Sequence, residues 1–146
     1  HLLTSLIEAY KKLEQPEEGL TVLAEAQALV EKTGERYYEA ELQRLKGELL
    51  LIQSPDEPAE AETCFNNALE IARRQHAKSL ELRTAMSLAR LWQRQGKGGD
   101  ASQLLNDVLA WFTEGFDTAD LRDAQALLNE LGAMKVVGIS GPRAAE

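Results

Sequence analysis

A pattern of one large residue followed by a small, a large and a small residue recurs three times along the chain, and it restricts the fold more than any other feature. A small side chain lets one helix of a pair approach the other closely, and the bulky residue fills the gap one turn away. A helix pair of this kind leaves apolar surface uncovered, so the three copies are expected to stack on one another. The copies, offset by 40 and 42 residues, are Tyr10, Gly19, Leu23 and Ala26; Leu50, Ala61, Phe65 and Ala68; and Trp92, Ala101, Leu105 and Val108.

Prolines and glycines divide the chain into seven segments in which apolar residues recur at steps of three and four, as they do in amphipathic helices. The composition also favours helices, because 24 Leu and 20 Ala far outnumber five Val and four Ile. No strand is predicted. The predicted helices cover about residues 2–14, 16–33, 36–53, 58–75, 79–95, 100–113 and 118–131, and residues 133–146 are expected to be a flexible tail or to be held by a neighbour.

Several of these helices have start and stop signals. Pro16 suits the first turn of a helix, where no N–H is needed, and Gly34 suits a left-handed stop. Pro58 is expected to open the fourth helix. The candidate N-caps of the fifth, sixth and seventh helices are Ser79, Asp100 and either Asp117 or Thr118.

The recurring pattern resembles the tetratricopeptide repeat, in which an aromatic residue near the end of the first helix is followed by a small, a large and a small residue along the second. The resemblance extends over about residues 2–112. It departs from the family in its length, 40 to 42 residues rather than 34, and in Leu50, which stands where the family has an aromatic residue. The resemblance implies an all-α fold whose first helices line a concave groove. The implied architecture is a right-handed superhelix of three helix pairs, at about residues 2–34, 36–76 and 79–113, closed by a capping helix over 118–131 and forming one domain over residues 1–132.

Five further runs of sequence are similar to the C-terminal repeat region of large bacterial signalling proteins that join a nucleotide cyclase domain, a regulatory ATPase domain and tetratricopeptide-like repeats. This similarity implies a sensor or scaffold segment at the end of such a chain, with the catalytic domains outside the present sequence. The chain begins at His1 within a predicted helix, which favours a piece of a longer protein. The runs are residues 38–51, 68–75, 79–83, 88–96 and 111–121.

The balance of charge limits the classes of partner. Sixteen basic and 24 acidic residues give a formal net charge of −8. This balance disfavours nucleic acids and membrane surfaces, because both are bound through an excess of basic groups. No apolar run is long enough to span a bilayer. The single cysteine, Cys64, favours a reducing compartment, so the expected location is cytoplasmic.

Catalytic and metal-binding motifs are missing from the sequence, so neither enzyme activity nor a cofactor is predicted. The two histidines, His1 and His76, have no Cys or His at metal-ligand spacing. Cys64 lies on an apolar helix face, which favours a small buried hydrophobe over a reactive thiol. The acidic residues Glu57, Glu60 and Glu62 are interpreted as an acidic first helical turn rather than as a metal site.

Three arginines, Arg83, Arg90 and Arg94, form a stripe along the fifth predicted helix, because spacings of seven and four place them on one face. In a tetratricopeptide-like fold this stripe would face the groove and could bind a peptide carboxylate or an acidic segment. The favoured alternative is structural, because Glu41 and Glu48 occupy the matching positions on the third helix and could bridge to Arg83 and Arg90, leaving Arg94 free. Simple solvation of the stripe is a third possibility. The candidate partner-binding groove comprises Glu41, Arg44, Glu48, Arg83, Arg90 and Arg94.

Two pairs of aromatic residues, Tyr37-Tyr38 and Trp111-Phe112, are predicted to pack in the core or between repeats rather than to form a ligand platform.

The predicted function is a protein–protein interaction or regulatory scaffold module that binds a partner protein or peptide in the concave groove. One alternative is self-association, by stacking at Leu2, Leu3 and Leu6 or at the end after Leu131. A second alternative is an effector-sensing domain that binds a small molecule. An apolar cavity would favour the small molecule, whereas an open groove would favour a peptide.

Overall fold

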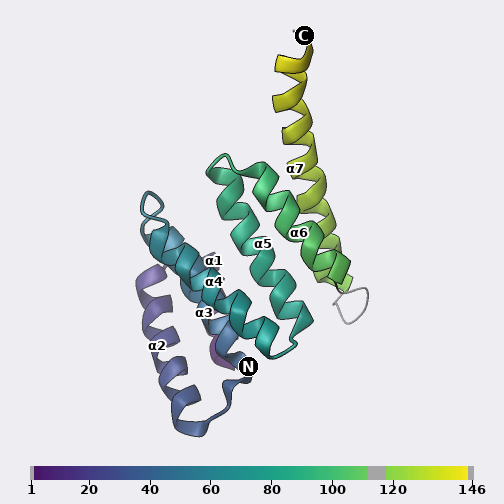
Figure 1. Cartoon of the computed structure of the whole chain (residues 1–146). Coiled ribbons are helices and arrows are strands. Elements are labelled where there is room, and N and C mark those ends of the chain that lie inside the picture. Colours follow the sequence, from purple (N-terminus) through teal and green to yellow (C-terminus); the bar gives the residue numbers. More distant parts are fainter. Residues whose placement is uncertain (1, 112–117, 145–146) are drawn as a thin grey trace.

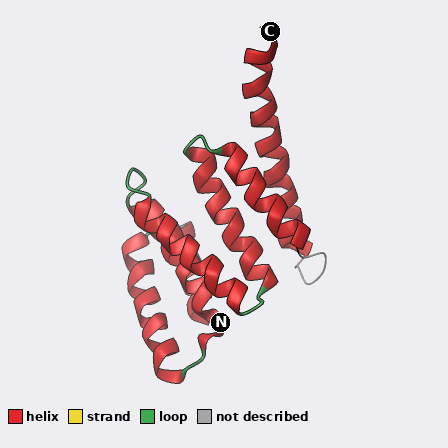
Figure 2. Ribbon diagram, in the orientation of Figure 1, coloured by secondary structure: helices red, strands yellow, loops and turns green. Residues whose placement is uncertain are grey.

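Antiparallel helices follow one another along the whole of residues 2–111 and 118–144, the part of the chain described by a computed structural model (Figures 1 and 2). This part is entirely helical apart from its turns and contains no strand, which confirms the all-α prediction for it. Within the described residues no helix has the length and apolar character needed to cross a membrane. The elements are α1 (Leu2–Lys12), α2 (Pro16–Thr33), the short 3₁₀-helix η1 (Arg36–Tyr38), α3 (Glu39–Gln53), α4 (Ala59–Arg74), α5 (Lys78–Arg94), α6 (Gly98–Trp111) and α7 (Thr118–Ala144).

The predicted signals at the two ends of α2 are confirmed. Pro16 is its first residue, and Gly34 follows its last turn with φ 74°, in the left-handed region. The N–H of Gly34 donates to the carbonyl oxygen of Val30 at 2.9 Å, which satisfies a carbonyl that the helix itself leaves unpaired.

The predicted caps of α5 and α6 are wrong by two and three residues, respectively. Both helices begin earlier, because the carbonyl of Ala77 already accepts the N–H of Glu81, and that of Lys97 accepts the N–H of Ala101. Ser79 and Asp100 therefore lie inside the first turns. Pro58 directly precedes α4, and Thr118 is the first residue of α7, whereas Asp117 lies outside the described residues.

The seventh helix is longer than predicted, and its C-terminal part extends beyond α6 (Figure 1). A stop before Gly132 was expected because glycine readily adopts the left-handed conformation, but Gly132 keeps ordinary helical geometry. The predicted end of the helix is therefore wrong, and the segment expected to be a flexible tail is helical through Ala144, with residues 145–146 outside the described part.

The recurring large and small residues form the contacts between the helices. Gly19 on α2 lies between α1 and α3, because a Cβ at Gly19 would be 2.8 Å from Leu49 Cδ2 and 3.3 Å from Tyr10 Cβ. Gly47 on α3, which is not part of the recurring pattern, lies against the ring of Phe65 on α4, because a Cβ at Gly47 would be 2.5 Å from Phe65 Cε1. The small and large residues of the pattern on the second helix of each pair are buried, namely Gly19, Leu23, Ala26, Ala61, Phe65, Ala68, Ala101, Leu105 and Val108.

The helices that open the pairs contact one another, whereas the helices that close them do not. Every helix packs on its neighbours in the sequence, and α1 also contacts α3, α3 contacts α5, and α5 contacts α7. Within the described residues α2, α4 and α6 make no direct contact with each other. One face of the molecule is therefore built from α1, α3, α5 and α7 lying side by side.

Candidate functional site

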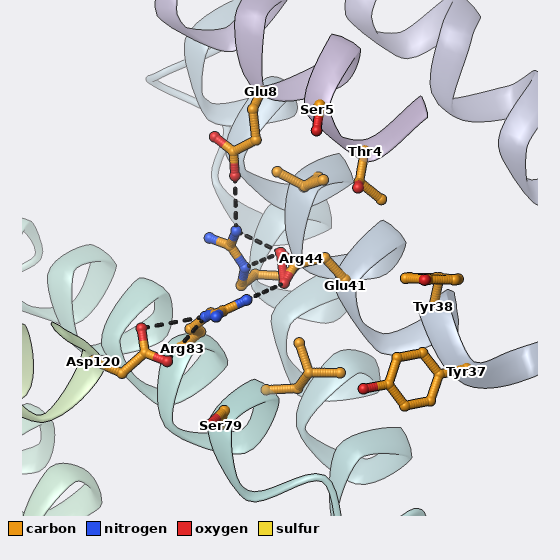
Figure 3. Close-up of a pocket in the computed structure, with 12 residues that line it drawn as sticks. Thr4, Ser5, Glu8, Tyr37, Tyr38, Glu41, Arg44, Ser79, Arg83 and Asp120 are labelled. Atoms are coloured by element: carbon orange, nitrogen blue, oxygen red, sulfur yellow. Dashed lines mark hydrogen bonds and ion pairs between the residues drawn. The ribbon is translucent and has the colours of Figure 1, made fainter. Parts of the chain in front are cut away.

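A pocket of about 660 Å³ lies on the face built from α1, α3, α5 and α7 (Figure 3). All four helices contribute side chains to it, and η1 adds two tyrosines at one end. The lining residues are Thr4, Ser5 and Glu8 from α1, Tyr37 and Tyr38 from η1, Glu41, Arg44 and Leu45 from α3, Ser79, Leu80 and Arg83 from α5, and Asp120 from α7.

Arg44 is the centre of the charged network in this pocket, and it is buried. Its Nε donates to Glu41 Oε1 at 2.6 Å, its Nη2 to Glu8 Oε1 at 3.1 Å, and its Nη1 to Ser87 Oγ at 3.3 Å. Burial lowers the pKa of Arg44, but Glu41, Glu48 and Glu8 outweigh that effect and raise the pKa above its ordinary value. The guanidinium therefore stays charged inside the protein.

The local geometry of α3 explains how this charge is held. Glu41, Arg44 and Glu48 are three and four residues apart, so they lie on one face of the helix. Glu48 Oε1 lies 3.5 Å from Arg44 Nη1 and accepts a hydrogen bond of 2.7 Å from the hydroxyl of Ser87 on α5. The network thus extends across the contact between α3 and α5.

Arg83 on α5 extends the network to α7. Its Nε donates to Asp120 Oδ1 and Oδ2 at 3.2 and 3.1 Å, and its Nη1 lies 3.5 Å from Glu41 Oε2. The side chain is 40% exposed, and burial lowers its pKa, but Asp120 and Glu41 outweigh this and raise the pKa above its ordinary value. A single carboxylate, Glu41, therefore contacts both arginines of the pocket (Figure 3).

The structure brings together only some of the six residues predicted for the groove. Glu41, Arg44 and Arg83 line the pocket. Glu48 lies outside the lining and forms an ion pair with Arg44. Arg90 and Arg94 are exposed, do not line the pocket and form no ion pair within residues 2–111 and 118–144.

One of the two predicted bridges between helices is present. Glu41 contacts Arg83 as expected, at 3.5 Å. The predicted bridge between Glu48 and Arg90 is wrong. Glu48 contacts Arg44 on its own helix and accepts a hydrogen bond from Ser87 instead.

Sequence reasoning missed Glu8, Asp120 and the two tyrosines as pocket residues. Glu8 and Asp120 reach the network from α1 and α7, and no local spacing relates them to Arg44 or Arg83. Tyr37 was predicted to pack in the core or between repeats, but its side chain is 68% exposed at the pocket. Its ring meets that of Tyr38 edge-on, with centroids 5.0 Å apart and planes at 88°. Of the other aromatic pair, the Trp111 side chain and all of Phe112 lie outside the described part.

The pocket is lined mainly by charged and hydroxyl side chains. Its lining holds three carboxylates and two guanidiniums, and each guanidinium has a carboxylate partner. The hydroxyl side chains of Thr4, Ser5 and Ser79 add groups that both donate and accept hydrogen bonds. Among the residues whose side chains are described, no group of three or more His, Cys, Asp or Glu is arranged to hold a metal ion.

The remaining candidates lie outside this pocket. Cys64 is buried, and burial raises the pKa of its thiol, as expected for a packing residue. Glu60 and Glu62 occupy the first turn of α4, where the helix dipole favours negative charge. His76 is exposed in the turn after α4.

Comparison with known proteins gives no relative, because no family model, no curated protein and no solved structure matches this chain. Its function is therefore inferred from the pocket and the residues that line it.

Proposed function

We propose that this chain is a protein–protein interaction module that binds a peptide segment of a partner in the pocket between α1, α3, α5 and α7. The observation that carries the proposal is the pocket itself, which is lined by all four of these helices and bordered by the exposed Tyr37. A site built from several helices of an array fits an extended segment, which can contact each helix in turn.

The helix contacts support a concave shape for this face. The helices α1, α3, α5 and α7 touch one another, whereas α2, α4 and α6, which lie behind them, have no mutual contacts within the described residues. A layer whose front row is closer together than its back row curves toward the front. Together with the threefold recurrence of the packing pattern, this curvature supports a tetratricopeptide-like array, for which the resemblance in sequence implies a right-handed superhelix.

The side chains of the pocket suit a segment that carries an apolar or aromatic residue and several backbone polar groups. The two tyrosines offer ring faces and hydroxyls at one end, and the network of Arg44 and Arg83 forms a fixed floor. Because these ion pairs already hold the side chains in place before the partner binds, the loss of side-chain conformational entropy on binding is small. The arginines already have carboxylate partners, and the lining has one more carboxylate than guanidinium groups, so the pocket has no preference for an acidic segment.

A small-molecule sensor is the weaker alternative. The pocket volume lies within the range that small ligands occupy. However, Leu45 and Leu80 are its only aliphatic lining residues among those described, whereas small-molecule sites are mostly apolar. We also propose, from the resemblance in sequence, that the module serves as a regulatory scaffold of a larger bacterial signalling protein; the single buried cysteine is compatible with a cytoplasmic location.

The proposal is tested by selecting binders from a phage-displayed library of random linear peptides. A selected peptide should bind the wild-type chain and lose about tenfold or more of its affinity to the Tyr37→Ala variant. Tyr37 is mostly exposed, so this substitution leaves the fold intact. The matched control is Leu29→Ala, which removes an exposed apolar side chain on α2 outside the pocket and should bind the peptide normally. Selection of no common motif, or equal loss of affinity in both variants, would reject the proposal.

A further inference from the structure

Arg83 carries hydrogen-bond donors that the protein itself does not use. Its Nε donates to the Asp120 carboxylate and its Nη1 to Glu41 Oε2, whereas its Nη2 has no hydrogen-bond partner among the described residues. Within the same part of the chain, the only buried side-chain nitrogen or oxygen that lacks a partner is Glu81 Oε1, so Nη2 of Arg83 is open to solvent. Two N–H groups of a guanidinium that lines the pocket are therefore available to a ligand.

The other guanidinium of the pocket is placed differently. Arg44 is buried, and each of its three nitrogens already has a partner. Figure 3 shows the Arg83 guanidinium with Asp120 on one side and Glu41 on the other. A ligand that accepts a hydrogen bond from this charged network therefore receives it from Arg83.

The surroundings of Arg83 favour a neutral acceptor over a charged one. The carboxylates of Asp120 and Glu41 already lie 3.1 and 3.5 Å from its guanidinium. A third carboxylate at this point would be repelled by both of them. A carbonyl oxygen carries only a partial negative charge, and its hydrogen bond from a charged donor is stronger than a hydrogen bond between two neutral groups. The acceptor that fits this place is thus the carbonyl of a peptide bond.

We propose that Arg83 holds the bound peptide by its backbone, with Nη2 donating to a main-chain carbonyl oxygen; this inference rests on the proposed function. Leu80 also lines the pocket, and it lies three residues before Arg83, on the same face of α5. The exposed ring of Tyr37 lines the same pocket. The bound segment therefore places an apolar or aromatic side chain against Leu80 and Tyr37 and a neighbouring carbonyl on Arg83.

The affinity of the phage-selected peptide, measured by titration calorimetry, tests the role of Arg83. Arg83→Met keeps a long side chain but removes the donors, so it should weaken binding by about tenfold or more, as expected for the loss of a hydrogen bond from a charged group. The matched control is Arg90→Met, which makes the same substitution at an exposed arginine of α5 outside the pocket and should leave the affinity unchanged. Circular dichroism verifies that both variants are folded. Equal affinities of the two variants would overturn the inference.

Backbone ester analogues of the peptide separate direct contact from a structural role of Arg83. An ester carbonyl is a weaker hydrogen-bond acceptor than an amide carbonyl, so one ester position should weaken binding to the wild-type chain and have a much smaller effect on binding to Arg83→Met. If Arg83 acted only by joining α5 to α7, every ester would affect both proteins equally, and the inference would be wrong. A scan in which no ester weakens binding to the wild-type chain would also overturn it, without any change to the protein.

Failure of this inference and failure of the proposed function give different results. A peptide that loses affinity to Tyr37→Ala but not to Arg83→Met would leave the pocket as the peptide site and overturn the role of Arg83. Selection of no peptide would overturn both.

Discussion

Arg83 and Asp120, which are 37 residues apart in the sequence, form a direct ion pair between α5 and α7, because Arg83 Nε donates to both oxygens of the Asp120 carboxylate. The same arginine also lies 3.5 Å from Glu41 on α3. Three of the four helices that line the pocket are therefore joined through one guanidinium.

A double-mutant cycle measures the coupling free energy between Arg83 and Asp120. Arg83→Gln and Asp120→Asn should each destabilise the chain, and the double variant should lose less than the sum, with a coupling free energy of about 1 kcal/mol. The value is modest because the Arg83 side chain is 40% exposed and water screens the pair. Urea unfolding of the four proteins provides the free energies. Strict additivity would mean that the pair contributes nothing to the docking of α7.

Arg44 should matter far more to stability than any other arginine of the groove. Replacing it with Met leaves Glu41, Glu8 and Glu48 without their shared cation, and Glu41 is itself buried. Removing one partner of a buried ion pair costs about 3–5 kcal/mol. The control Arg94→Met alters an exposed residue without an ion pair in the described part of the chain, and it should change the unfolding free energy by less than about 0.5 kcal/mol. Similar effects of the two substitutions would contradict a structural role for the network.

The stability contributed by Glu8 should depend on pH in the acidic range. Burial raises the pKa of Glu8, but the charges and hydrogen bonds of Lys11 and Arg44 outweigh it and hold the pKa below its ordinary value of 4.5. A carboxyl group with a lowered pKa in the folded state stabilises the protein above its unfolded pKa, and this contribution disappears as pH falls through the folded value. The difference in unfolding free energy between the wild type and Glu8→Gln should therefore be constant near neutral pH and shrink below about pH 4.5. If the difference in unfolding free energy between the two proteins grew as the pH falls, the pKa of Glu8 would be raised rather than lowered in the folded state. That result would refute the pairing of Glu8 with Lys11 and Arg44.

Two glycines should respond to alanine in opposite directions. A Cβ at Gly47 would lie 2.5 Å from the Phe65 ring, so Gly47→Ala should cost about 1–3 kcal/mol through overpacking between α3 and α4. Gly132 is helical, and a Cβ there would have no atom of the described residues within 4 Å beyond its own helix backbone, so Gly132→Ala should stabilise the chain by up to about 1 kcal/mol. Thermal unfolding of the two variants tests both expectations. A lower stability of the Gly132→Ala variant would count against the extended α7.

The positions of the helices were largely predictable from the sequence because the residues that determine them are local. Periodic leucines and alanines define the helices, and Pro16 and Gly34 set the ends of α2 through backbone geometry alone. The end of α7 was not predictable in this way. Glycine permits a left-handed stop but does not force one, and Gly132 continues the helix.

The pocket was predictable only where its contacts follow helical spacing or the repeat offset. Glu41 and Arg44 are three residues apart, and Glu41 and Arg83 are related by the 42-residue offset. Asp120 and Glu8 enter from the two outer helices at positions that no periodicity relates to their partners. Arg90 shares the stripe with Arg83, yet no carboxylate of the described residues pairs with it, because Glu48 is already held by Arg44 and Ser87.

The most direct test of the proposed function is to map where a selected peptide contacts the chain, by following backbone amide chemical shifts during a titration of the ¹⁵N-labelled protein. Binding in the pocket should produce saturable shifts concentrated at the pocket residues of α1, η1, α3 and the start of α5, with little change along the outer faces of α2 and α4. Shifts centred on those outer faces, or on the exposed leucines Leu2, Leu6 and Leu13, would contradict a peptide site in the pocket.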